Sequence, residues 1–129
     1  SLAGCILLLE AVNQYLGQVD RLLTMLRKSG RLDGVVGVAV GQFTNCRPSG
    51  GLGIRYLLRE HLAALGVPIL GGLPLGHGER PLPVPTGALA RLDADARTLT
   101  VFRGEGPRPR ARRAGPPRPR ISVAPRQNG

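Results

Sequence analysis

The fold is decided by the stretch Val35-Val36-Gly37-Val38-Ala39-Val40, a continuous run of apolar and mostly β-branched residues. A short run of this kind is typical of a strand that is buried on both faces of a sheet. Two further apolar runs precede and follow it: Cys5-Ile6-Leu7-Leu8-Leu9, which ends at the carboxylate Glu10, and Pro68-Ile69-Leu70. The sequence therefore predicts three short strands, the second of which ends at Gly41.

Amphipathic segments separate these strands. Between the first two, apolar residues recur at i, i+3, i+4 and i+7 from Val19 to Leu26, which predicts a helix of about three turns that stops at Ser29-Gly30. A second helix is predicted over residues 54–65, where four leucines share one face. Strands that alternate with helices in this way indicate the α/β class.

The chain after the third strand is turn-rich. Residues 71–78 are dominated by glycine, three prolines within residues 81–85 enforce an extended path, and residues 89–92 and 98–102 flank a plausible hairpin turn. We expect one domain over residues 1–102, with a small mixed sheet or barrel-like core and two main helices.

The strongly basic character of the chain belongs to its last segment. The net charge is +10, and residues 103–129 hold eight arginines against Glu105, a net +7, which leaves +3 for residues 1–102. Six prolines and almost no large apolar residue predict that residues 103–129 are a disordered Arg/Pro-rich tail. Clustered charge of this kind favours nonspecific binding of nucleic acid or another polyanion. The tail lacks the aromatics that single-strand recognition usually adds, so nucleic acid is not the expected partner.

Several classes of protein are excluded by composition and spacing. No apolar run reaches the roughly 18 residues of a membrane helix, so we expect no membrane segment. The two cysteines, Cys5 and Cys46, cannot form a disulfide framework and belong to no metal-binding pattern. The glycine pairs lack the spacing of a nucleotide-binding loop. We therefore expect no metal and no cofactor.

Glu10 and His77 are the two candidate catalytic residues. Glu10 follows an apolar strand, where an unpaired charge is costly, and His77 lies in a Gly-His-Gly turn that leaves its imidazole accessible. A carboxylate and an imidazole are the orienter and the base of a catalytic triad. From the residues alone, a capping or salt-bridging Glu10 and an ordinary loop His77 are the stronger interpretation.

A nucleophile is missing from these patterns. None of the four serines lies in a nucleophile elbow or an SxxK motif. Cys46 is interpreted as a small buried or loop cysteine. His61 lies on the second helix without the HExxH pattern of a metal site, and we expect it to be a surface or half-buried residue.

Two motif blocks resemble the C-terminal domain of the LD-carboxypeptidases, the muramoyltetrapeptide carboxypeptidases to which the microcin C immunity peptidases are related. The first runs from Leu9-Glu10 through Val19-Asp20-Arg21-Leu22-Leu23 to the segment 32–46 (LDGVVGVAVGQFTNC). The second is the segment 66–78 (GVPILGGLPLGHG), followed by Val84-Pro85-Thr86-Gly87. The resemblance covers about residues 2–101 and does not reach the tail.

The resemblance implies a swivelling β/β/α fold and a cytoplasmic serine peptidase with a Ser-Glu-His triad. Such enzymes remove the terminal D-alanine from murein tetrapeptide in cell-wall recycling, and a homodimer is expected for the full-length enzyme. By motif, Glu10 is the triad carboxylate and His77 the general base. The nucleophilic serine belongs to an N-terminal Rossmann-like domain that this chain lacks, so we expect a C-terminal part that is inactive alone. The alternative is a non-enzymatic fragment or pseudogene product whose tail binds polyanions.

Six positions within or beside these motifs depart from the residues usual in the family. Ala11 and Gln14 stand where the family usually has acidic residues, and Gly17 stands where it usually has tyrosine. Gln42 replaces an aspartate, and Pro81 and Pro83 replace polar residues. The departures bear on substrate contacts and leave Glu10 and His77 in place.

Overall fold

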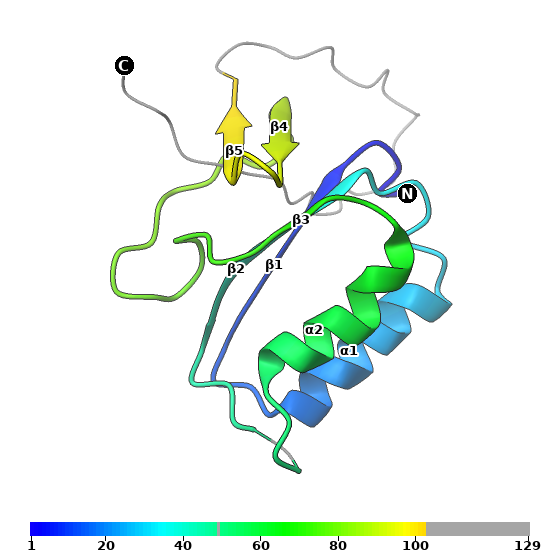
Figure 1. The fold of residues 1–129 in the computed structure, drawn as a ribbon, viewed down its shortest axis with the longest axis vertical. Coiled ribbons are helices and arrows are strands. Elements are labelled where there is room, and N and C mark those ends of the chain that lie inside the picture. The colour runs from blue at the N-terminus through cyan, green and yellow to red at the C-terminus, as the bar shows by residue number, and fades with distance from the viewer. Residues whose placement is uncertain (49, 103–129) are drawn as a thin grey trace, which may run out of the picture.

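The computed structural model describes residues 1–48 and 50–102. Its elements, in chain order, are β1 (Ile6–Val12), α1 (Leu16–Lys28), β2 (Gly37–Thr44), α2 (Ile54–Leu62), the 3-10 turn η1 (Ala63–Leu65), β3 (Ile69–Leu70), β4 (Ala90–Asp93) and β5 (Thr98–Val101) (Figure 1). The α/β class is confirmed. The predicted basic tail, residues 103–129, lies outside the described residues.

The three predicted strands form one parallel sheet in the order β1-β2-β3. Side chains alternate along β2, so Val38 and Val40 join the helix-side core while Ala39 joins the core of the opposite face. Val38 and Ala39 have no solvent exposure. Burial on both faces explains why this strand is apolar throughout.

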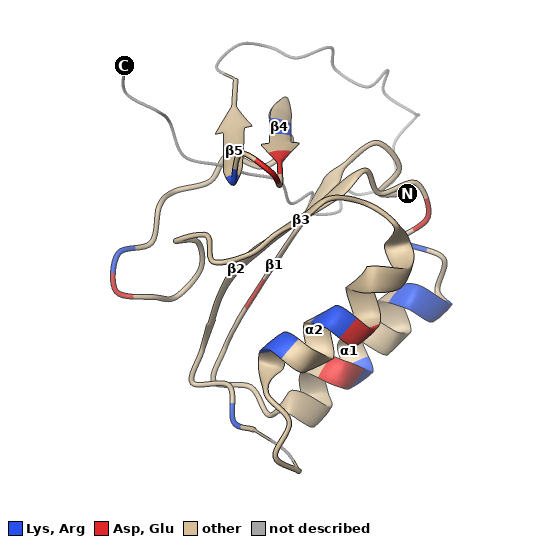
Figure 2. Ribbon diagram, viewed as in Figure 1, with Lys and Arg blue, Asp and Glu red and all other residues tan. Residues whose placement is uncertain are grey.

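Helices α1 and α2 lie side by side on one face of the sheet (Figure 1). Val19 and Leu23 of α1 and Leu58 and Leu62 of α2 pack in the same core cluster. Charged residues are spread along both helices, whereas β2 and β3 carry none (Figure 2). The second helix covers the predicted range, except that its last turn is the 3-10 turn η1.

The opposite face is covered by the hairpin β4-β5 and by the segment that leads to it. Leu99 of β5 and Leu73 and Leu75 of the segment pack with Ile6 and Leu70 of the sheet. The hairpin forms a separate antiparallel sheet. In the described chain, the parallel pairings are therefore in one sheet and the antiparallel pairing is in the other.

Strands β1 and β2 both continue beyond the predicted ends at Glu10 and Gly41. The register shifts where Leu9 pairs with Val40 but Ala11 pairs with Phe43, so β2 has one extra residue opposite Glu10. Such a bulge bends a strand and re-aims nearby side chains without ending the pairing. The predicted stop at Gly41 is therefore wrong, because this glycine is part of the bulge.

None of the helices in the described part of the chain is long and apolar enough to cross a membrane.

Candidate active site

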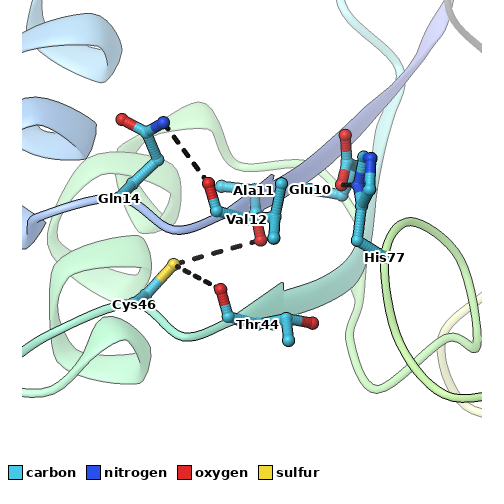
Figure 3. Close-up of polar contacts among 7 residues, drawn as sticks. All are labelled: Glu10, Ala11, Val12, Gln14, Thr44, Cys46 and His77. Carbon is cyan, nitrogen blue, oxygen red and sulfur yellow. Dashed lines mark hydrogen bonds and ion pairs between the residues drawn. The ribbon is translucent and has the colours of Figure 1, made fainter.

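The structure brings Glu10 and His77 together, although 67 positions separate them in the sequence. The imidazole Nδ1 of His77 lies 2.9 Å from the carboxylate Oε2 of Glu10 (Figure 3). The Glu10 side chain is 32% exposed and that of His77 is 60% exposed. The carboxylate is thus partly enclosed, while the imidazole is open to a second molecule or domain.

Glu10 is held by the sheet. It lies in β1, opposite the extra residue of the bulge formed by Gly41 and Gln42. Because the pairing of β1 and β2 resumes at Ala11, both sides of Glu10 are fixed in the ladder. The backbone beneath the carboxylate therefore belongs to a strand rather than to a loop.

His77 is held by a segment that docks on the edge of the same bulge. The amide of Leu73 donates to the carbonyl of Val40 at 3.2 Å, and the amide of Gln42 donates to the carbonyl of Leu75 at 2.7 Å. Leu75 is 1% exposed and packs under the sheet. These contacts fix the chain two residues before the imidazole.

Two glycines permit this close approach. The position of Gly41 requires glycine, because a Cβ there would lie 2.6 Å from the carbonyl oxygen of Leu75. Gly76 has φ +105°, and a Cβ on it would lie 2.7 Å from Oε2 of Glu10. The Gly-His turn therefore packs directly on the carboxylate, which is the physical reason for glycine beside this histidine.

Gly78, on the other side of His77, packs against the side chain of Gln42. The Oε1 atom of Gln42 is buried and has no hydrogen-bond partner among the described residues. The turn that carries His77 is thus enclosed between Glu10 and Gln42.

The arrangement supplies an oriented base. When Nδ1–H donates to the Glu10 carboxylate, Nε2 carries the lone pair and can accept a proton. The carboxylate also stabilises the imidazolium that forms after proton transfer. The pair can therefore perform the acid–base half of a hydrolytic reaction.

None of the hydroxyl or thiol groups in the described residues is hydrogen-bonded to His77. Ser1 and Ser29 make local backbone contacts, and Ser49 and Ser122 lie outside the described residues. Cys46 is half-buried, and its Sγ lies 3.8 Å from the carbonyl oxygen of Thr44, away from the imidazole (Figure 3). The described residues thus hold the Glu10–His77 pair without an adjacent hydroxyl or thiol.

A second histidine–carboxylate pair joins the two helices. Nε2 of His61 on α2 lies 2.7 Å from Oδ1 of Asp20 on α1. The His61 side chain is 8% exposed, so the expectation of a surface or half-buried residue is wrong. The cause is the packing of α2 on α1, which covers the imidazole.

The described residues contain no group of three or more histidine, cysteine, aspartate or glutamate side chains that could hold a metal ion.

The described residues thus form an α/β unit in which a carboxylate contacts an exposed imidazole. The chain belongs to the LD-carboxypeptidase C-terminal domain family, which it matches over residues 1–92.

Named relatives agree with this assignment. The chain is 46% identical over 100 residues to a Streptomyces coelicolor protein named "Putative carboxypeptidase", covering 78% of this chain and 32% of that protein. It is 32% identical over 94 residues to the murein tetrapeptide carboxypeptidase of Pseudomonas aeruginosa, covering 72% of this chain and 31% of that protein. The chain therefore spans about a third of the length of the curated relatives that it matches.

The fold has a solved counterpart. The crystal structure of muramoyltetrapeptide carboxypeptidase from Oxalobacter formigenes superposes with a TM-score of 0.55 at 28% identity. The match covers 62% of this chain and 29% of that one.

Proposed function

We propose that this chain is the part of a serine LD-carboxypeptidase that supplies Glu10 as the triad carboxylate and His77 as the general base. The reaction is removal of the terminal D-alanine from murein tetrapeptide, in the cytoplasm, during cell-wall recycling. The observation that carries the proposal is the 2.9 Å contact between His77 Nδ1 and Glu10 Oε2, made by an imidazole that is 60% exposed. The murein peptidase among the relatives supports the choice of substrate.

The proposed reaction uses His77 twice. A serine Oγ attacks the carbonyl carbon before D-alanine while its proton passes to Nε2 of His77, which Glu10 stabilises as the imidazolium. The proton then passes to the nitrogen of D-alanine as the C–N bond breaks and an acyl-enzyme remains. Water attacks this ester, again losing its proton to His77, and the tripeptide is released with the serine restored.

In this proposal the serine comes from an N-terminal Rossmann-like domain, and residues 1–102 form the C-terminal domain of a homodimeric enzyme. The relatives are about three times as long as the matched segment, which leaves room for such a domain. Because triad members act as a unit, the chain without the serine should be inactive.

The test is D-alanine release by the enzyme that joins this chain to its serine domain. Glu10→Gln should lower kcat/KM by about 10³-fold or more, because the amide cannot stabilise the imidazolium. Glu60→Gln, on the exposed side of α2, is the matched control and should leave the rate unchanged. The chain alone should release no D-alanine.

Two results would contradict the proposal. Turnover at enzyme-like rates by the chain alone would overturn the need for a serine domain. Equal rates for Glu10→Gln and Glu60→Gln in an active enzyme would overturn the assigned roles. The alternative of polyanion binding rests on residues 103–129, outside the described residues.

A further inference from the structure

Beyond Glu10, strands β1 and β2 end in a matched pair of asparagines. Asn13 follows β1 with φ 54° and Asn45 follows β2 with φ 52°, both in the left-handed region. The Nδ2 of Asn45 donates to the Oδ1 of Asn13 at 3.1 Å. Two of the three non-glycine residues with positive φ in the described chain are therefore side by side, and asparagine is a residue type that adopts this conformation readily.

The two segments that follow the asparagines remain paired. The amide of Arg47 donates to the carbonyl of Gln14 at 3.0 Å, and the amide of Leu16 donates to the carbonyl of Arg47 at 3.3 Å. These bonds hold the side chains of both segments around one space. A pocket of about 390 Å³ lies there, lined by Asn13, Gln14, Tyr15, Asn45 and Arg47.

The pocket lies at one end of the parallel sheet. It lies at the carboxyl ends of the adjacent parallel strands β1 and β2, just beyond the last paired residues, Val12 and Thr44. Its lining combines the Tyr15 ring with polar side chains from both segments, and most of these residues are exposed.

Arg47 gives the pocket its charge. Its guanidinium lies 5.3 Å from the centre of the Tyr15 ring, and its Nη1 donates to the Tyr15 hydroxyl at 3.2 Å. Arg47 is the charged residue among the described residues of the lining, which include no carboxylate. A guanidinium has five N–H donors, so the contact with Tyr15 leaves further donors in the fork geometry that fits a carboxylate.

The pocket lies on the same strand as the candidate catalytic pair. Asn13 is three residues beyond Glu10, which is about 10 Å along an extended strand. A tetrapeptide bound at Glu10 and His77 can span this distance in extended form.

We propose that the Asn13–Arg47 pocket binds a carboxylate of the peptide substrate that is remote from the cleaved bond. Arg47 pairs with the carboxylate, and the amides of Asn13, Gln14 and Asn45 orient the groups around it. The identity of the ligand rests on the function proposed above. Two carboxylates fit this chemistry: that of the diaminopimelate side chain and that of the glutamyl residue before it.

Kinetics of the enzyme with its serine domain test the pocket. Arg47→Gln should raise KM for the diaminopimelate tetrapeptide by 10- to 100-fold, which is about the loss of one charged bidentate contact, and should change kcat less. Arg47→Lys should give a KM between that of the unmodified enzyme and that of Arg47→Gln, because the ammonium keeps the charge but not the forked pair of donors. Arg91→Gln, on the exposed β4 position, is the matched control and should have no effect.

The lysine tetrapeptide, which lacks the side-chain carboxylate, distinguishes the two sources. A KM change confined to the diaminopimelate substrate would assign the pocket to that side chain, and an equal change with both substrates would assign it to the glutamyl carboxylate. Either result supports the pocket. An unchanged KM for both substrates with Arg47→Gln in an active enzyme would overturn it.

A binding measurement separates this inference from the proposed function. The murein tripeptide product, added to the ¹⁵N-labelled chain, should shift the side-chain amide signals of Asn13 and Asn45, and Arg47→Gln should abolish the shifts. If the joined enzyme is inactive but these shifts occur, the pocket stands and the proposed function fails. If millimolar tripeptide causes no shift in the folded chain, the pocket proposal fails.

Discussion

The molecule contains two histidine–carboxylate pairs with similar contact distances. In one pair the histidine is the more exposed partner, and in the other the carboxylate is. In the pair formed by Glu10 and His77 the imidazole is 60% exposed and the carboxylate 32% exposed. In the pair formed by Asp20 and His61 the imidazole is 8% exposed and the carboxylate 54% exposed. The contact distances, 2.9 and 2.7 Å, do not distinguish the two pairs.

The difference teaches that accessibility, rather than the hydrogen bond itself, separates a candidate base from a structural contact. The Nδ1 of His61 is buried without a partner among the described residues, and its Nε2 contacts Asp20. The His77 side chain is 60% exposed, on a turn that packs on Glu10. The first pair should therefore control turnover, and the second should control the packing of α1 on α2.

The largest expected effect is on turnover. His77→Ala in the enzyme with its serine domain should lower kcat by at least about 10³-fold, because the base is removed from both proton transfers. His61→Ala should keep kcat within a few-fold, measured as D-alanine release at a temperature where both variants are folded. Equal losses in the two variants would show that the pairs do not differ as their exposure indicates.

The turn that holds His77 gives the next largest effect. Gly76→Ala places a Cβ 2.7 Å from Oε2 of Glu10 at φ +105°, so the turn must move away from the carboxylate. A displacement of about 1 Å in a catalytic group can lower the rate by about 10²-fold, and we expect a loss of this size.

Gly87→Ala is the matched control for that substitution. Gly87 has φ +76°, and nothing lies within 4 Å of its added Cβ, so alanine there brings backbone strain without a clash. It should cost about 1 kcal/mol of unfolding free energy and leave the rate unchanged. A full rate for Gly76→Ala would mean that the close approach to Glu10 does not position the imidazole.

The sequence predicted the strands and helices because their signals are local. The apolar run at residues 35–40 and the helical spacing from Val19 to Leu26 depend on neighbours within a few residues. The resemblance of residues 66–78 to a known motif also singled out His77 before any contact was known. These parts of the fold could be predicted without the structure.

Features that depend on distant residues could not be predicted in the same way. The continuation of β2 beyond Gly41 requires the docked carbonyl of Leu75, more than 30 positions away. The burial of His61 requires Asp20, which is 41 positions away on another helix. The pocket beside Arg47 exists only because two loops remain paired beyond their strands.

The buried imidazole should be a determinant of stability. His61→Ala removes a hydrogen bond to a charged group and leaves a void between the helices, so the chain should lose about 2 kcal/mol of unfolding free energy. Urea unfolding followed by circular dichroism measures this loss, and His77→Ala in the exposed turn serves as the control, with a change below about 0.5 kcal/mol. A larger loss for His77→Ala would reverse the proposed division between the pairs.

The smallest expected effect is on the unfolding free energy when each of the two carboxylates, Asp20 and Glu10, is replaced by its amide. Asp20→Asn should cost about 0.5–1 kcal/mol, because the carboxylate is half exposed and the amide oxygen can still accept from His61. Glu10→Gln should cost less than about 0.5 kcal/mol of unfolding free energy. Its partner His77 is mainly exposed to solvent, so the loss of their contact removes little stabilisation. Both values come from urea midpoints measured on the same chain with a common slope. If Glu10→Gln were the more destabilising of the two, the Glu10–His77 contact would be stabilising the fold rather than being held in place by it.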